Sequence, residues 1–174
     1  MDDRSADPAP LILTLLLDSE SFARLDRLRR AHFPAHLNRI PAHVTLFHAL
    51  PGAEEPAVLA RLAEEVGRTP PLPLRVTGVM PLGRGTALKV EAPEAAALRA
   101  RLAAAWSSWL SPQDRQGWRP HVTIQNKVTP EEARLLQDGL RAGFAPWEAT
   151  AEGLLLWRYR GGPWEAAGRF DFAG

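Results

Sequence analysis

Cysteine is absent from the sequence, which excludes disulfide bonds, thiolate zinc sites and thiol nucleophiles. No apolar stretch approaches the roughly 18 residues that a membrane-spanning helix requires. The N-terminus, MDDRSADPAP, is acidic and contains proline, whereas a secretory signal starts with basic residues followed by an apolar run. These absences predict a cytoplasmic protein whose chemistry depends on side chains other than cysteine.

The sequence also lacks an excess of either charge, because 21 basic residues and 20 acidic residues leave a net charge of +1. A protein that covers a long nucleic-acid duplex needs many basic contacts to phosphates, so this function is not expected. Binding of one phosphate or one RNA end needs only a few local charges and stays compatible. The hydrophobic content of 45% over 174 residues is sufficient for the core of a single domain.

Apolar runs closed by turn residues predict strands, and apolar residues at helical spacing predict helices. The strands are expected at residues 11–18, 42–50, 72–80, 86–92 and 147–159 and around residue 121, and the helices at residues 19–32, 54–67, 93–110 and 130–142. Corresponding elements in the two halves are offset by about 75 residues, which is typical of a duplicated strand-helix-strand-helix-strand unit. We therefore expect one domain over residues 1–174, with repeats at roughly 10–80 and 85–160 and a C-terminal hairpin at 150–172.

The tripeptide His-Val-Thr occurs twice, in IPAHVTLFHAL (residues 40–50) and in RPHVTIQNKV (residues 119–128). The five histidines and eight threonines of the chain would produce on the order of 0.2 His-x-Thr tripeptides by chance. Residues two apart in a strand share a face, so His43 is expected beside Thr45, and His121 beside Thr123. If the repeats pack about a pseudo-twofold axis, these two pairs face each other across a cleft.

Two imidazoles on opposite sides of a substrate suit phosphoryl transfer to water or to an alcohol. One imidazole takes a proton from the attacking oxygen, and the other gives a proton to the leaving oxygen. A histidine with an ordinary pKa of about 6.5 can take either role at neutral pH. Threonine hydroxyls can donate hydrogen bonds to the phosphate oxygens as negative charge builds on them.

The segments AHVTL and RPHVTI resemble the paired motifs of the 2H phosphoesterase superfamily, in particular its branch of 2′-5′ RNA ligase-like proteins and RNA 2′,3′-cyclic phosphodiesterases. The resemblance implies an α+β fold of two pseudo-twofold-related lobes, each an antiparallel sheet with outer helices, around a central cleft. It implies that His43 and His121 are the general acid and base, that Thr45 and Thr123 bind the phosphate, and that no metal or other cofactor takes part. Relatives of this branch hydrolyse a 2′,3′-cyclic phosphate to a 2′-phosphate, and their ligase reaction runs similar chemistry backwards. The sequence leaves open which histidine is the acid.

The alternation of side chains along a strand predicts further residues on the same face as the motif pairs. Phe47 follows Thr45 on the same face and is a candidate for stacking on a base. Gln125 and Lys127 follow Thr123 in the same way and are expected to meet the substrate beyond its phosphate.

Ionisable residues outside the two motif pairs have other expected roles. Arg84 in a glycine-flanked hairpin tip and Arg158 near the last turn are candidates for the rim of a phosphate site. His48 falls on the face of Val44, opposite the motif pair, so a structural role is expected for it. A metal site is not expected, because neither motif contains His-x-His or an acidic residue that would complete a set of ligands. None of the six tryptophans is taken as a sign of a ligand.

Three functions are compatible with these observations. The first is a metal-independent enzyme that hydrolyses 2′,3′-cyclic phosphates at RNA ends, with reversible 2′-5′ ligation as an extension. The second keeps both histidines but acts on a small nucleotide, such as a cyclic phosphate of ADP-ribose. The third is a module that binds a terminal phosphate without turnover. A monomer is expected in each case, because a cleft between two lobes needs no partner subunit.

Overall fold

The computed structural model describes residues 8–174, and the acidic residues 1–7 lie outside this described part. Seven strands, four α-helices and two short 3-10 helices occur within it. In chain order they are β1 (Leu11–Leu17), α1 (Ser19–His32), η1 (Ala35–Leu37), β2 (Thr45–Leu50), η2 (Gly52–Glu54), α2 (Glu55–Val66), β3 (Leu72–Leu82), β4 (Gly85–Glu91), α3 (Pro93–Ala105), β5 (His121–Gln125), α4 (Pro130–Gly143), β6 (Trp147–Arg158) and β7 (Glu165–Asp171). None of the helices between residues 8 and 174 has the length and apolar character needed to cross a membrane.

The predicted elements all occur, with the main differences at two boundaries. β2 begins at Thr45 and not at residue 42, so His43 lies in the segment just before the strand. α3 ends at Ala105 and not at residue 110, because Trp106 leaves the helical conformation with φ −108° and ψ 19°. Pro112 follows shortly afterwards, and proline cannot continue a helix.

Side-chain caps determine where two of the helices begin. Asp18 precedes α1, and its carboxylate accepts hydrogen bonds from the backbone N–H of Ser21 at 2.9 Å and of Thr150 at 2.8 Å. α4 begins with a capping box, in which Thr129 and Glu132 exchange side-chain to backbone hydrogen bonds. The Asp18 cap therefore also joins the start of α1 to β6.

All strand pairs are antiparallel, and β6 connects the two halves of the sheet. The order is β2-β1-β6-β3-β4-β5, and β7 pairs with β6 outside this path. Residues 147–151 of β6 pair with β3, whereas residues 151–158 pair with β1 and residues 153–158 with β7. The first half therefore comprises β2, β1, β7 and the end of β6, and the second half comprises β5, β4, β3 and the start of β6.

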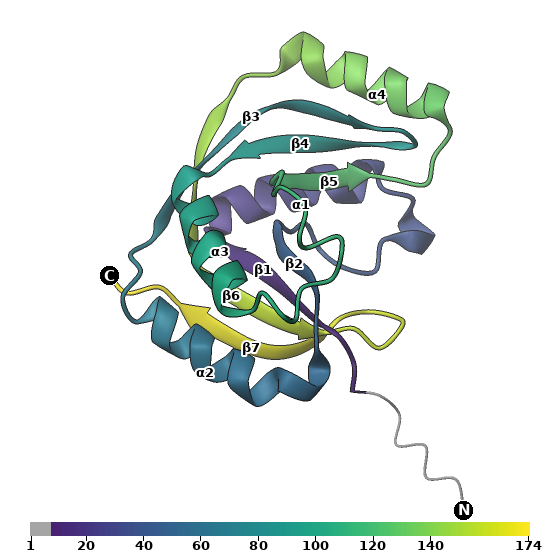
Figure 1. Cartoon of the computed structure of the whole chain (residues 1–174). Helices are drawn as coiled ribbons and strands as arrows, with labels where there is room; N and C mark the ends of the chain where they lie inside the picture. Colours follow the sequence, from purple (N-terminus) through teal and green to yellow (C-terminus); the bar gives the residue numbers. More distant parts are fainter. Residues whose placement is uncertain (1–7) are drawn as a thin grey trace, which may run out of the picture.

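Two strands pair across the boundary between the predicted repeats. β3 lies in the predicted first repeat but pairs with β4 of the second, and β6 lies in the predicted second repeat but pairs with β1 of the first. Helices α2 and α4 lie at opposite ends of the molecule, where α2 packs on β6 and β7 and α4 packs on β3 and β4 (Figure 1). The fold of helices and antiparallel strands that the sequence predicts is confirmed.

A single hydrophobic core runs through both halves. Burial of one leucine or phenylalanine side chain stabilises the folded state by about 1.5–3 kcal/mol. The largest fully buried side chains in this core are Phe47, Leu11, Leu13, Leu25, Leu46, Leu50, Leu62, Leu88, Leu98, Leu102, Ile124 and Leu154.

β2 contains a β-bulge directly after the first motif. Neighbouring residues of β1 pair with residues two apart in β2, and the partners are Thr14 with Thr45 and Leu13 with Phe47. Leu46 is therefore the extra residue. A bulge interrupts the alternation of side chains, and both Leu46 and Phe47 point into the core with 0% exposure.

β5 has the same irregularity directly after the second motif. Its partners in β4 are Ala87 for Thr123 and Thr86 for Gln125, so Ile124 is the extra residue. Ile124 is 0% exposed and Gln125 is 6% exposed. Both motifs are thus followed by an equivalent bulge, and neither bulge contains a glycine that would signal it in the sequence.

Candidate active site

The two motifs line one cleft between the halves of the sheet. The cleft has a volume of about 360 Å³, and its wall includes His43, Thr45, His121 and Thr123. Each of these four residues is partly exposed. The structure therefore brings together the two imidazoles and two hydroxyls that the repeated tripeptide predicts to meet.

The two motif histidines are held in the same way. Nδ1 of His43 lies 2.8 Å from the carbonyl oxygen of Pro41, and Nδ1 of His121 lies 2.7 Å from that of Arg119. A carbonyl oxygen only accepts, so each ring carries a proton on Nδ1 and donates it to the residue two positions earlier. In the neutral ring Nε2 then holds the lone pair, and it is the ring atom that is able to exchange a proton with a ligand in the cleft.

The electrostatic surroundings of His43 favour its neutral form. Burial lowers the pKa of His43 from 6.5 to about 4, and the hydrogen bond to Pro41 opposes this change without cancelling it. Burial is the largest cause of this lowered pKa, and electrostatic repulsion by Arg29, His121 and His48 contributes to it in the same direction. His43 is therefore neutral at pH 7, with an unprotonated Nε2.

We expect the imidazole of His43 to titrate with a midpoint of about 4, because its protonated form loses hydration and faces like charges. The measurement is the pH dependence of the imidazole resonances by NMR, with the signal assigned through its loss in His43→Gln. The unfolded chain takes up this proton first, so the contribution of His43 to stability falls as the pH drops from 6.5 to about 4. A midpoint at 6.5 or higher would contradict this description of the site.

Side chains from distant segments hold the backbone of both motif threonines. Nε1 of Trp118 donates a hydrogen bond to the carbonyl oxygen of Thr45 at 2.9 Å. In the other half, Nη1 of Arg29 donates to the carbonyl oxygen of Thr123 at 2.8 Å. A bulge leaves backbone groups without a partner on the neighbouring strand, and these two bonds satisfy carbonyls beside the bulges.

His48 lies in the cleft wall, on the opposite face of β2 from the one that strand alternation predicts. The extra residue Leu46 reverses the alternation of β2, so His48 joins Thr45 in lining the cleft. Its Nδ1 lies 3.1 Å from Oδ1 of Asp114. The predicted placement of His48 with Val44, away from the motif pair, is therefore wrong.

Asp114 is 1% exposed and ties the loop before β5 to β2. Its carboxylate accepts hydrogen bonds from the backbone N–H groups of His48 at 2.8 Å and of Ala49 at 3.0 Å. Arg99 spans the same junction, because it donates to the carbonyl oxygens of Leu46 and Asp114, each at 2.8 Å. Burial alone would raise the pKa of Asp114, but the hydrogen bonds from His48 and Ala49 outweigh it and lower the pKa. No sequence signal links these residues, because they are far apart in the chain.

Phe47 and Gln125 do not reach the cleft, so their predicted placement beside the substrate is wrong. Phe47 packs in the core against Trp106, with 5.4 Å between the ring centroids, and the guanidinium of Arg99 lies 4.7 Å from the centroid of Phe47. Gln125 accepts a hydrogen bond from Thr86 at 3.0 Å inside the protein. The physical reason in both cases is the bulge, which turns the residue two positions after the threonine into the core.

The three charged candidates also lie apart from the residues that line the cleft. Lys127 is exposed in the turn after β5, with a φ of 60°. Arg84 lies in the turn between β3 and β4 and donates to the carbonyl oxygen of Val128 at 3.1 Å. Arg158 binds the carboxylate of Glu55 through two hydrogen bonds of 2.6 and 3.0 Å and so joins β6 to α2.

Positive charge reaches the cleft from Arg99 and Arg119, two residues that the sequence analysis does not select. Arg119 is exposed at the rim. An arginine in such a position suits a phosphate ligand, because its planar group offers several donors. Between residues 8 and 174, no group of three histidine, aspartate or glutamate side chains is arranged to hold a metal ion.

Comparisons with known proteins identify the family of the chain and similar folds. A family model described as the 2′-5′ RNA ligase superfamily matches residues 17–163. Among solved structures, TT0787 of Thermus thermophilus has a TM-score of 0.67 and 21% identity, with 95% of this chain and 98% of that chain covered. LigT of E. coli in complex with 3′-AMP has a TM-score of 0.63 and 20% identity, with 97% and 100% covered. These likenesses show the fold. No curated protein matches the chain at a significant level.

Proposed function

Because the chain belongs to the 2′-5′ RNA ligase superfamily of 2H phosphoesterases, we propose that it hydrolyses the 2′,3′-cyclic phosphate at an RNA end to a 2′-phosphate. The observation that carries this proposal is the equivalent Nδ1 hydrogen bond of His43 and His121 to a backbone carbonyl. This hydrogen bond leaves Nε2 of each ring available to contact a ligand, and both rings line the same cleft. An acid and a base acting on one phosphorus require such an arrangement.

In the proposed reaction His43 is the general base. Its lowered pKa keeps it neutral at pH 7, so Nε2 takes a proton from a water molecule as the water oxygen attacks the phosphorus. The negative charge of the bound phosphate raises this pKa and makes the imidazole a stronger base in the complex.

His121 is then the general acid. In its doubly protonated form, with one proton on Nδ1 and one on Nε2, the ring gives the Nε2 proton to the 3′-oxygen as the bond between that oxygen and the phosphorus breaks, and it is left neutral. The products are a 2′-phosphate and a 3′-hydroxyl group. A 5′-hydroxyl of RNA in place of water gives a 2′-5′ linkage through the same two proton transfers, which is the ligation that the proposal includes.

Thr45 and Thr123 bind the phosphate in this proposal. Both line the cleft beside their histidines, and their hydroxyl groups donate to the non-bridging oxygens, where charge increases in the transition state. The hydrogen bonds from Trp118 and Arg29 to their carbonyl oxygens support this role, because they fix the backbone that carries the hydroxyls.

The test is incubation of the purified protein, in EDTA, with a short RNA that ends in a 2′,3′-cyclic phosphate. We expect conversion to a 2′-phosphate, identified by ³¹P NMR and mass spectrometry, whereas the same RNA with a 3′-hydroxyl end stays unchanged. A 3′-phosphate product would contradict the assigned leaving group, and loss of activity in EDTA would contradict a metal-independent reaction.

Two further outcomes identify the alternatives. Binding of the RNA without turnover would support the phosphate-binding module. Turnover of a cyclic phosphate of ADP-ribose, with none of the RNA, would support a small-nucleotide enzyme.

A further inference from the structure

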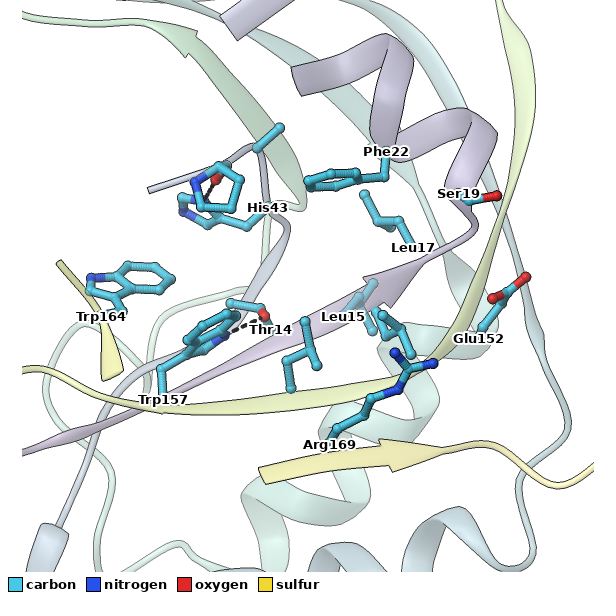
Figure 2. A pocket seen from close by; sticks show the side chains of 14 residues that line it. Thr14, Leu15, Leu17, Ser19, Phe22, His43, Glu152, Trp157, Trp164 and Arg169 are labelled. Atoms are coloured by element: carbon cyan, nitrogen blue, oxygen red, sulfur yellow. Dashed lines mark hydrogen bonds between the residues drawn. The ribbon is translucent and has the colours of Figure 1, made fainter. Parts of the chain in front are cut away.

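A second pocket opens beside the cleft and is shown in Figure 2. Its volume is about 370 Å³, and His43 and Trp164 line both the pocket and the cleft. Sites for small molecules have volumes of about 300–1,000 Å³, so this pocket suits one compact group. That group would lie directly next to the proposed phosphate position.

The floor of the pocket continues the floor of the cleft. Ile12 lines the cleft and Thr14 lines the pocket, and residues two apart in β1 point to the same face. On the neighbouring strand β6, Trp157 pairs with Ile12 and Leu155 pairs with Thr14. Both β6 residues line the pocket. A ligand can therefore extend from His43 across β1 and β6 on one face of the sheet.

Aromatic rings lead from the cleft into this pocket. The ring centroid of Trp164 lies 4.8 Å from that of His43 and 6.0 Å from that of Trp157. Nε1 of Trp157 donates to Oγ1 of Thr14 at 3.0 Å, which fixes the orientation of the indole (Figure 2). Phe22 of α1 borders the pocket and is 36% exposed. Such partly exposed rings suit a flat π system that stacks on them.

The charges around the pocket do not suit a second phosphate. Among the described residues that line it, Glu152 and Arg169 carry opposite charges, and Arg169 also donates to Asp171 at 3.0 Å. Binding along a nucleic-acid backbone requires an excess of positive charge. In Figure 2, Ser19 and Glu152 lie at the end of the pocket away from Trp164, beyond Leu15 and Leu17. A nucleobase is flat and uncharged, so it matches the aromatic wall next to His43 better than a second phosphate does.

We propose that this pocket binds the nucleobase of the substrate, stacked on Trp164, while the phosphate lies between His43 and His121. That the group bound between the two histidines is a phosphate rests on the proposed function. Apart from the phosphate, the protein then contacts a single terminal nucleoside of the substrate. This assignment extends the substrate class to nucleoside 2′,3′-cyclic phosphates without a longer RNA chain.

The test measures binding separately from turnover. Adenosine 2′-phosphate, and ribose 2-phosphate as the same ligand without a base, are titrated by calorimetry into the wild-type protein and Trp164→Ala. We expect the wild-type protein to bind the adenosine ligand about 5- to 150-fold more tightly, the equivalent of ~1–3 kcal/mol for stacking of one base. Trp164→Ala is expected to abolish this preference, and Trp164→Phe is expected to restore most of it because the ring returns.

Tyr159→Ala is the matched control, because Tyr159 is 44% exposed and lines neither the pocket nor the cleft. It is expected to keep the preference of the wild-type protein. Equal binding of the two ligands by the wild-type protein, or an equal loss of both in Trp164→Ala, would overturn the nucleobase assignment. Turnover of the cyclic phosphate RNA is measured in parallel. A clear base preference without turnover would count against the proposed hydrolysis and would still support the pocket.

Discussion

Alanine in place of His43 or His121 is expected to lower the rate of cleavage of an RNA 2′,3′-cyclic phosphate by about 10²–10⁴-fold in each variant. Each substitution removes one of the two proton transfers, and the methyl group of alanine cannot replace either. The double variant is expected to be little less active than the less active of the two single variants, because the two imidazoles act in one step. The measurement is single-turnover kinetics with protein in excess over RNA, which separates the chemical step from product release.

His36→Ala is the control for this experiment. His36 is exposed in η1, shortly before the first motif, and does not line the cleft, so its variant is expected to cleave at the wild-type rate. Thermal unfolding of all variants distinguishes a lost proton transfer from a lost fold. A wild-type rate in His43→Ala or His121→Ala would show that the imidazole concerned takes no part in the reaction.

Asp114→Ala is expected to lower the free energy of unfolding by about 3 kcal/mol, since each buried N–H group that loses its acceptor costs ~1–3 kcal/mol. The groups concerned are the backbone N–H donors of His48 and Ala49, which both bind this carboxylate. The His48 ring loses its partner as well. The measurement is urea unfolding followed by circular dichroism, in which a shift of the midpoint at constant slope reports a change in stability.

Asp138→Ala is the control for this second experiment. The Asp138 side chain is 80% exposed, and a surface substitution of this kind changes stability by about 0.5 kcal/mol or less.

The lowered pKa of Asp114 also determines how the stabilisation by its carboxylate depends on pH. The stabilisation is complete above the unfolded pKa of about 3.9 and is lost as the pH falls through the lower pKa of the folded state. A stability difference between wild type and Asp114→Ala that stays constant in acid would contradict the role of the carboxylate.

Most of the fold and the centre of the cleft could be predicted from the sequence, because both depend on spacing along the chain. The helical and strand elements follow from apolar periodicity, and the predicted helix over residues 19–32 matches α1. The two His-Val-Thr copies occupy equivalent positions of a repeated order of elements. The predicted duplication would place these copies on opposite sides of a cleft, and the structure does bring His43 and His121 into one cleft.

The errors at Phe47, Gln125 and His48 have one origin. Prediction from alternation assumes that each strand keeps its register with its neighbour. β2 and β5 each break this register directly after the motif, at Leu46 and at Ile124. The carbonyls beside these bulges are held by side chains from other elements, such as Arg99 of α3. Because these partners lie far away in the sequence, nothing within either strand indicates the bulge.

The sequence by itself determined the order of the elements, the two motif pairs and the absence of thiol chemistry, because each of these is a property of residue types and their spacing. Only the tertiary structure decided that β3 and β6 exchange between the halves, that Asp114 supports His48, and that Trp164 stands beside His43. These contacts join loops and strands that are distant in the chain. They form when strand pairing and side-chain packing bring such segments together, which no local pattern records.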